Sequence, residues 1–370
     1  MGNFTRAGKK PKILVVPLDW GLGHATRCIP IIYELINLSC EVIIASSGDQ
    51  ERLLQDEFPL LRFVKLEGYG IRYARTRFTT PFLIGMQIPK ILRKIRNEKK
   101  WLSQFIHTEQ PDAIISDNRY GLYEKKIPSI FITHQIQIKT GFGKMLDQIL
   151  QKINHRYIRK FSMCWIPDNE GEFSLAGSLS NPPSIKEIQT VMLGPISRFK
   201  PCHNQTHQHI LFLLSGPEPQ RMILEKKLLE LAKLISARII LVRGLPLETK
   251  LPDFPPNVTI FNHASTDQIN QLICGAEFVI SRSGYTTIMD LMILGKKSIL
   301  IPTPGQAEQE WLANWLYQKK FAYSISQEKL RAECLEEAKS FNYRPYETTE
   351  RCTLRIAIER LVQKITEDKK

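Results

Sequence analysis

Short apolar runs, separated by stretches of helical periodicity, are the dominant pattern in the first half of this chain. The apolar runs fall at residues 13–17, 41–45, 62–66, 113–116, 129–133, 163–166 and 191–193. Between them, residues 25–38, 50–57 and 144–160 carry apolar positions at helical spacing. Continuous apolar runs that alternate with helices indicate parallel strands buried on both faces of a sheet. We therefore expect a doubly wound α/β domain.

The pattern is interrupted at residues 195–208 by two prolines and a polar run, and then begins again. Strands are expected at 210–214, 238–242, 258–261, 278–280 and 298–301, and helices at 220–235, 266–274, 285–294, 308–319, 327–339 and 348–365. We expect a first domain over 1–195, a linker at 196–208, a second domain over 209–345, and a last helix within 346–370 that packs back on the first domain. Such domains bind ligands at the carboxyl ends of their strands, here in the cleft between them.

The net charge of +14 changes this picture, because it predicts an anionic partner. More than half of this positive charge lies in residues 72–100, which contain a single acid, Glu98. The basic residues of the segment are Arg72, Arg75, Arg77, Lys90, Arg93, Lys94, Arg96, Lys99 and Lys100. Apolar residues are interleaved with them, as in an interfacial helix on an anionic membrane. An amphipathic core helix with a solvated basic face is the alternative. We favour membrane contact.

Seven scattered cysteines, with no CxxC pair, predict reduced structural thiols rather than a disulfide framework. His203, His207 and His209 lie in the expected linker with no acid or cysteine at ligand spacing, so a solvated linker is favoured over a metal site, and we expect neither a metal nor a cofactor. No apolar run is long enough for a signal peptide or a spanning helix. We therefore expect a cytoplasmic protein whose membrane association, if it has one, is peripheral.

The first strand ends in a glycine turn, Gly21-Leu22-Gly23, which presents His24 at the start of a helix. The turn is not a dinucleotide fingerprint, because Thr26 replaces the third glycine, and it is not a Walker loop. The positive end of the helix disfavours an imidazolium, so His24 is suited to accept a proton. The alternative is a histidine that only caps or packs.

Polar residues also follow two later strands of the first half. Asp117 and Asn118 come after 113–116, and His134 comes after 129–133. If the strands are neighbours, Asp117 reaches His24 and holds its tautomer. A helix cap or an Asx turn is the commoner use of such an aspartate, and His134 can be an ordinary loop residue.

The most informative turn of the chain is 281–284 (Ser-Arg-Ser-Gly), between the strand 278–280 and a helix that opens at Tyr285. Small residues at a helix start leave backbone N–H groups free to bind an anion. Asp290, about two turns along, is placed to bind a ribose, and the polar loop 302–310 is placed to bind sugar hydroxyls. Together these features predict a nucleotide-sugar site.

The turn 281–284, Asp290 and the run Gln306–Glu310 resemble the donor-binding signature of GT-B fold glycosyltransferases. The resemblance is greatest to family 28, with its peptidoglycan UDP-N-acetylglucosamine transferases and monogalactosyldiacylglycerol synthases. Gly21–His24 is similar to the glycine-rich loop of that family's first domain. The resemblance implies two facing Rossmann-like domains and an inverting, metal-independent reaction. A hexose or N-acetylhexosamine would pass from a UDP-sugar to an acceptor hydroxyl, with a lipid-linked acceptor among the candidates.

The resemblance also implies roles for single residues. His24 would be the general base and Asp117 its partner, with Gly21, Gly23, Asn118 and His134 on the acceptor side. On the donor side, the residues near the diphosphate would be Ser215, Gly216, Ser283, Gly284 and Tyr285. His263 and Ala264 would contact the uracil, and Asp290, in place of the usual Glu, would contact the ribose. Glu308 and Gln309 would bind the sugar hydroxyls, and Arg243 lies at a neighbouring strand end.

Three other functions remain open at this point. A UDP-sugar epimerase of the same fold usually places several carboxylates around the anomeric carbon, and few are found here. A non-catalytic subunit that binds a UDP-sugar or recruits a partner to the membrane would show no turnover. Nucleic-acid binding rests on charge alone, with no recognised motif, and we do not expect it.

Overall fold

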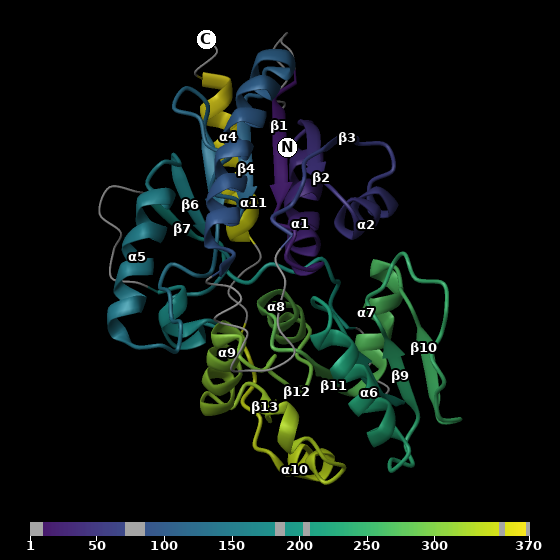
Figure 1. The fold of residues 1–370 in the computed structure, drawn as a ribbon. Helices are drawn as coiled ribbons and strands as arrows, with labels where there is room; N and C mark the ends of the chain where they lie inside the picture. The colour runs from purple at the N-terminus through teal and green to yellow at the C-terminus, as the bar shows by residue number, and fades with distance from the viewer. Residues whose placement is uncertain (1–9, 71–85, 182–188, 203–207, 348–351, 368–370) are drawn as a thin grey trace.

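The computed structural model describes residues 10–70, 86–181, 189–202, 208–347 and 352–367. They form two parallel sheets flanked by helices, one above the other in the view of Figure 1. The first sheet has seven strands in the order β3-β2-β1-β4-β5-β6-β7, and the second has six in the order β10-β9-β8-β11-β12-β13. The predicted architecture of two doubly wound α/β domains is confirmed.

The first domain contains the strands β1 (Lys12–Pro17), β2 (Glu41–Ser46), β3 (Arg62–Lys65), β4 (Ala113–Asp117), β5 (Ser129–Ile132), β6 (Met163–Ile166) and β7 (Gln189–Met192). Its helices are α1 (Gly23–Asn37), α2 (Asp49–Glu57), α4 (Ile88–Glu109) and α5 (Lys144–Ile158), with short 3₁₀ turns at Gly171–Phe173 and Gly177–Leu179. The central strands are mostly apolar because both faces of the sheet are covered.

The second domain contains β8 (His209–Leu213), β9 (Ile239–Val242), β10 (Val258–Phe261), β11 (Ala276–Ser281), β12 (Ser298–Leu300) and β13 (Tyr323–Ser324). Its helices are α6 (Gln220–Ala232), α7 (Thr266–Gly275), α8 (Tyr285–Ile293), α9 (Ala307–Gln318) and α10 (Cys334–Ser340). The last helix, α11 (Cys352–Glu367), lies beside the first domain instead (Figure 1). Its residues Ile358, Leu361 and Ile365 belong to the same core as α1 and β1.

Strand order places the ends of four strands at the cleft. In the first sheet the chain leaves β1 toward β2 on one side and later returns to β4 on the other; in the second sheet β8 and β11 are related in the same way. The carboxyl ends of strands at such a switch point form a crevice. The turns after β1 and β4 therefore face those after β8 and β11, and α1 contacts α8 across the cleft.

The helix α4 packs on the sheet with its apolar side. Ile95, Leu102 and Phe105 are buried against the first domain, while Arg93 and Arg96 point to solvent. For residues 88–100 this packing is the arrangement given above as the alternative to an interfacial membrane helix, namely a core helix with a solvated basic face. The basic and apolar positions predicted at 72–84 lie outside the described residues. Within the described ranges, no helix is long and apolar enough to cross a membrane.

The helix predicted at 327–339 is wrong, because the chain forms a 3₁₀ turn at Gln327–Lys329 and only later the helix α10. Leu330 is extended between them, with φ −61° and ψ 122°. The Lys227 ammonium donates to the carbonyl oxygens of Gln327 and Glu328. These two carbonyl oxygens therefore accept hydrogen bonds from a side chain instead of from the backbone N–H groups of a following helical turn.

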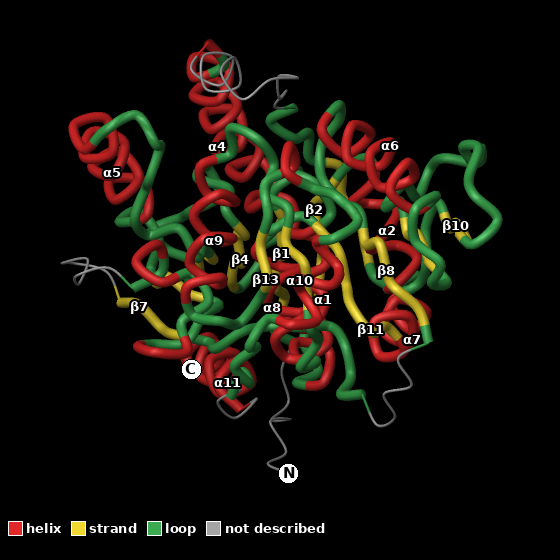
Figure 2. Tube along the Cα trace, turned by 90° about the horizontal axis from the view of Figure 1, so that it is seen from below, coloured by secondary structure: helices red, strands yellow, loops and turns green. Residues whose placement is uncertain are grey.

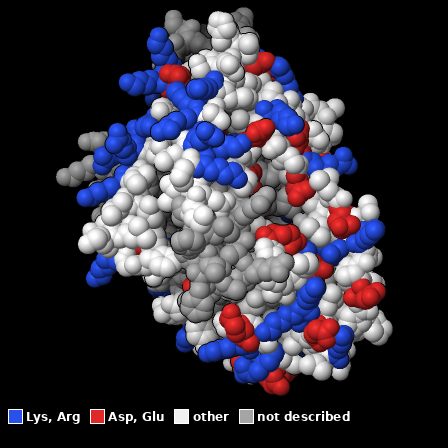
Figure 3. Space-filling model, viewed as in Figure 1, with Lys and Arg blue, Asp and Glu red and all other residues white. Residues whose placement is uncertain are grey.

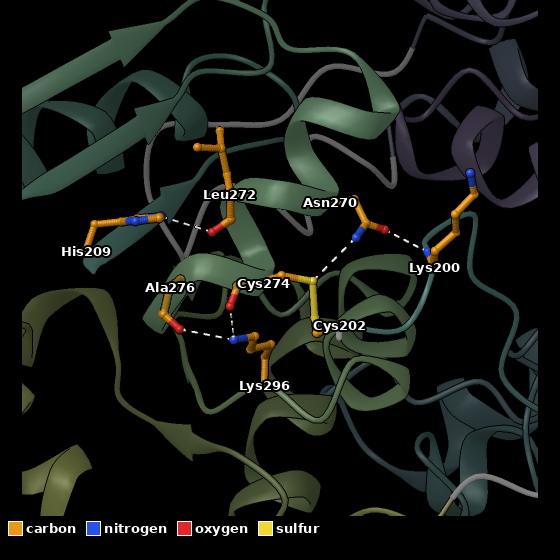
Figure 4. Close-up of a disulfide and its surroundings, with 8 residues drawn as sticks. All are labelled: Lys200, Cys202, His209, Asn270, Leu272, Cys274, Ala276 and Lys296. Atoms are coloured by element: carbon orange, nitrogen blue, oxygen red, sulfur yellow. Dashed lines mark hydrogen bonds between the residues drawn. A yellow bond between two sulfur atoms is a disulfide. The ribbon is translucent and has the colours of Figure 1, made fainter. Parts of the chain in front are cut away.

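The expectation that every cysteine is a free thiol is also wrong. Cys202 forms a disulfide with Cys274, which lies 72 residues away at the end of α7 (Figure 4). The side-chain oxygen of Asn270 on α7 accepts from the N–H of Lys200 at 2.7 Å, which holds the segment before β8 along that helix. Spacing in the sequence gives no sign of this contact. Cys28, Cys40, Cys164 and Cys334 are buried free thiols.

Candidate active site

A cavity of about 120 Å³ lies between the two domains. The first domain contributes the turn after β1 and the residue that follows β5 by two positions; the second contributes the turns after β8 and β11 and the start of α9. Residues predicted for the site line it from both sides: Gly21, Gly23, His24 and His134 from the first domain, and Ser215, Gly216, Gly284, Tyr285, Glu308 and Gln309 from the second. Ten residues from distant parts of the chain thus meet in one cavity.

The two glycines after β1 let the domains approach closely. Gly21 has a φ of +73°, and a Cβ placed there would lie 3.7 Å from the Cα of Gly216. A Cβ on Gly23 would come within 3.2 Å of the Thr286 hydroxyl, which donates to the Gly23 carbonyl at 2.9 Å. The glycine turn is therefore required for contact with α8 as well as for presenting His24.

His24 is held from behind by a buried aspartate. Its Nδ1 lies 3.1 Å from Oδ2 of Asp117, which is completely buried at the end of β4. A carboxylate can only accept, so in the tautomer whose Nδ1–H donates to Asp117 the lone pair of the ring is on Nε2. Asp117 therefore lies beside His24, and within the described part of the chain its carboxylate bonds to the side chains of His24, Arg27 and Cys28 rather than capping a helix.

Arg27, to which the sequence analysis gave no role, completes this cluster. Its guanidinium forms an ion pair with Asp117, with Nε 3.2 Å from Oδ2, and its Nη2 lies 3.0 Å from Nδ1 of His24. Burial works to raise the pKa of Asp117, but Arg27 and His24 outweigh it and hold that pKa below its ordinary value. Asp117 is thus ionised and fixed. The signal in the sequence was the position of Arg27, one turn after His24 on the same helix face.

His134 and Glu308 form a second pair that bridges the domains. Nε2 of His134 lies 2.7 Å from Oε1 of Glu308, and the imidazole stacks on Tyr285 with centroids 3.9 Å apart. Burial lowers the pKa of His134, so a neutral imidazole donates to the carboxylate. Burial opposes ionisation of Glu308, but His134, His24 and Arg27 hold its pKa below the ordinary value. The predicted sugar-binding carboxylate is therefore engaged by a first-domain residue in this state.

The start of α8 is the anion-binding feature of the second domain. Gly284 occupies the N-cap position without a side-chain cap, so first-turn N–H groups have no partner within the helix. Tyr285, Thr286 and Thr287 line the cavity there. Ser283 is fully buried and donates to the carbonyl of Gln309 at 2.9 Å, so its hydroxyl fixes the turn. Gln309 also accepts from the N–H of Thr303 at 2.9 Å.

Asp290 lines a smaller cavity of about 70 Å³ beside the first, together with His263, Ser215 and Arg198. Its carboxylate accepts from the Ser197 hydroxyl at 2.5 Å. Burial raises the pKa of Asp290 to about 7, although Arg198 and Ser197 act in the opposite direction. Ser197 and Arg198 lie in the segment predicted as a linker, whose composition did not mark them as site residues.

Besides Asp117 and Ser283, which are completely buried, three predicted site residues line neither cavity, and one of the three has a clear reason. Arg243 forms an ion pair with Glu225 at 3.0 Å and donates to Asn262 at 2.6 Å, so its guanidinium is taken up within the second domain. Ala264 is buried in the core beside α7. Asn118, with φ +60°, follows Asp117 without lining the cavity.

Comparison with known proteins agrees with this geometry. Residues 222–350 match the family model of the glycosyltransferase family 28 C-terminal domain. An uncharacterized glycosyltransferase of Methanosarcina acetivorans is 25% identical over 359 residues, covering 90% of this chain and 89% of the relative. A UDP-N-acetylglucosamine–N-acetylmuramyl-(pentapeptide) pyrophosphoryl-undecaprenol N-acetylglucosamine transferase of Clostridium perfringens is 24% identical, with 88% of each chain covered.

Solved structures share the two-domain fold at low identity. A spinosyn rhamnosyltransferase complexed with thymidine diphosphate has a TM-score of 0.61 at 14% identity, covering 96% of each chain. MurG of Acinetobacter baumannii has a TM-score of 0.53 at 16% identity, covering 97% of this chain and 100% of that one. The chain thus has the GT-B fold, and the family match together with the named relatives identifies it as a glycosyltransferase. The match to family 28 is confined to residues 222–350, in the C-terminal domain.

Proposed function

We propose that this glycosyltransferase is inverting and metal-independent, and that it moves a hexose or N-acetylhexosamine from a UDP-sugar to an acceptor hydroxyl. A lipid-linked acceptor is the first candidate, because the Clostridium perfringens relative is named for an undecaprenol-linked one. One observation carries the proposal. His24, backed by Asp117, and the uncapped start of α8 line the same interdomain cavity from opposite sides.

The reaction follows from this arrangement. Nε2 of His24 takes the proton of the acceptor hydroxyl, and the acceptor oxygen forms a bond to the anomeric carbon of the donor. The bond from that carbon to the diphosphate oxygen breaks on the opposite face, which inverts the configuration. Negative charge then grows on the leaving diphosphate, where first-turn N–H groups of α8 stabilise it without a divalent ion.

Donor recognition is assigned to the second domain. We place the ribose at Asp290 and the base near His263, in the smaller cavity that adjoins the start of α8. Glu308 and Gln309 are placed to receive the sugar hydroxyls. Because Glu308 is paired with His134 here, binding of the sugar to its carboxylate requires exchange of that hydrogen bond.

An epimerase of the same fold is less well supported. Glu308 is the one carboxylate among the described residues that line the larger cavity. Epimerases of this fold usually surround the anomeric carbon with several. The composition of the cavity therefore favours transfer to an acceptor.

The test is a donor screen by thermal shift with UDP-, GDP- and dTDP-sugars, followed by an assay of nucleotide release. We expect the largest shift with a UDP-sugar, and UDP formation only when an acceptor is present. Conversion of the donor without an acceptor would identify an epimerase. Binding without turnover for any acceptor, including lipid-linked ones, would identify a non-catalytic subunit.

Membrane contact through residues 72–100 is a further part of the proposal. Six of the basic residues named for this segment, Lys90, Arg93, Lys94, Arg96, Lys99 and Lys100, lie on α4. Lys90, Arg93, Arg96 and Lys100 are exposed, whereas Lys94 and Lys99 pair with Glu67 and Glu124. An anionic membrane surface is the partner that the exposed charge favours.

A further inference from the structure

The helix α5 is amphipathic, but its polar side faces the protein. Asn154 is buried and donates to the carbonyl of Gln135 at 3.1 Å. Gln151 accepts from the N–H of Ile138 at 2.6 Å, and Asp147 is bonded to the next part of the same loop. The side of α5 that packs on the domain is therefore held by hydrogen bonds. Near the end of the helix the buried Ile158 adds an apolar contact on this side.

The outer side of α5 is a stripe of exposed apolar residues. Along the helix and the loop before it, apolar side chains recur every three or four positions, and their exposed fractions are large: Phe142 60%, Met145 78%, Leu146 39%, Ile149 51% and Ile153 45%. Figures 1 and 2 both show α5 at the rim of the molecule, away from the second sheet. A contiguous exposed apolar surface of this kind marks a binding surface.

Basic residues border this α5 stripe. Lys144, Lys152 and Arg156 are exposed on the helix. The acid of the helix, Asp147, accepts from the N–H and hydroxyl of Thr140 at 2.8 and 2.6 Å. On the face shown in Figure 3, Lys and Arg side chains gather where α4 and α5 lie.

The two helices are also joined through Tyr123. The ammonium of Lys99 on α4 lies 4.4 Å from the Tyr123 ring centroid, and that of Lys160, just after α5, lies 5.2 Å from it. Basic side chains from α4 and from the segment just after α5 therefore meet at one ring.

We propose that the α5 stripe inserts into the surface of a bilayer that contains anionic lipids, with the helix lying in the plane of the membrane. Aliphatic and aromatic side chains with basic neighbours are the composition of interfacial helices. A second copy of this chain would bring two basic borders together, which costs energy. A nucleic acid would leave the aliphatic side chains without a partner.

The stripe is connected to the catalytic cleft. Lys139, in the loop that leads into α5, places its ammonium 3.1 Å from the ring centroid of Trp311 on α9. A Cβ on Gly141 would lie 4.0 Å from that of Ala307, the first residue of α9 and the neighbour of Glu308. A membrane bound at α5 would thus lie next to the loop that touches the sugar-binding end of the cleft. This would place a lipid-linked acceptor within reach of the cleft, a consequence that rests on the proposed function, whereas membrane binding itself does not.

The experiment is co-sedimentation of the full chain with vesicles of phosphatidylglycerol and phosphatidylcholine, without donor or acceptor. The variant Ile149→Ser with Ile153→Ser should partition into vesicles at least about tenfold less than the unmodified chain, because each change removes a buried aliphatic side chain from the lipid. The matched control is Leu60→Ser with Leu234→Ser, at positions 97% and 73% exposed outside the stripe. This control should bind as the unmodified chain does.

A second variant, Lys152→Glu with Arg156→Glu, keeps the apolar residues and should lose binding to anionic vesicles. It remains informative if the serine variant folds poorly, and melting curves of all variants check folding. Equal binding by the stripe variants and the control would overturn the proposal. So would an unmodified chain that does not bind vesicles, or a dimer in sedimentation velocity that the serine changes dissociate. Because no substrate is used, these results are independent of donor identity and of turnover.

Discussion

The two sides of the interdomain cleft differ in the groups that they present: side chains on one side and backbone on the other. The first domain contributes polar and charged side chains, with His24 and Arg27 both bonded to the buried carboxylate of Asp117. The second domain presents the backbone at the start of α8, with small residues around it. A proton must be taken by a particular atom of a particular side chain, whereas a diphosphate can be bound by N–H groups that every residue carries. Substitutions should therefore separate chemistry from donor binding.

The sharpest test of this difference is His24→Ala. Loss of a general base should lower turnover by about 10²–10⁴-fold. The affinity for UDP should be unchanged, because the assigned nucleotide contacts all belong to the second domain. Calorimetry with UDP and a UDP-release assay measure the two quantities. Unchanged turnover would remove His24 from the mechanism.

The second test asks whether the first-domain cluster is a single unit. Arg27→Met leaves the carboxylate of Asp117 buried without its main partner, so the free energy of unfolding should fall by roughly 3–5 kcal/mol. The control is Arg52→Met, which breaks an exposed pair with Asp56 at 3.3 Å and should change stability by less than about 1 kcal/mol. Urea denaturation distinguishes them; equal small effects would show that the cluster is not cooperative.

Asp290 is the exception on the second-domain side, since it is a buried carboxyl with a raised pKa of about 7. In the unfolded chain this carboxyl releases its proton near pH 4, whereas the folded state holds it to about pH 7. The folded state thus binds more protons in this window, and its stability falls as pH rises from about 4 to about 7, by up to about 4 kcal/mol. Asp290→Asn should remove this fall, as urea denaturation at several pH values would reveal. An identical pH profile for both chains would contradict the raised pKa.

The same residue tests the ribose assignment. Asp290→Ala should weaken UDP binding by about tenfold, the equivalent of one good hydrogen bond to a charged group. Calorimetry measures the change, and His24→Ala serves as the reference for an intact donor side. Unaltered affinity would move the ribose elsewhere.

The smallest effect for each residue changed is expected on the outer surface of the first domain. Charge reversal at Arg93, Lys94 and Arg96 should weaken binding to anionic vesicles by about 1 kcal/mol per residue removed from the membrane field. Turnover with a soluble acceptor should not change. Binding that is insensitive to these charges would leave the α5 stripe as the sole membrane contact we propose.

Much of this architecture was accessible from the sequence, for a physical reason. Strands buried on both faces must be apolar, and the turns that follow them carry the polar residues of the site, so His24, Asp117 and Gly284 could be placed at strand ends. Partners distant in the chain could not be assigned in this way. The guanidinium of Arg27 bonds to Asp117, 90 positions away in the sequence. Cys202 forms a disulfide with Cys274, 72 positions away. Helical periodicity at 144–160 predicted α5 but not which of its sides faces the protein.

The packing of α11 on the first domain means that this domain is discontinuous in sequence. The chain crosses the cleft once before β8 and again before α11. Two segments of the chain therefore connect the domains. A fragment ending at residue 202 would lack Ile358, Leu361 and Ile365 from its core. Any attempt to produce the first domain alone would therefore need the segment 352–367, either fused or supplied as a separate peptide.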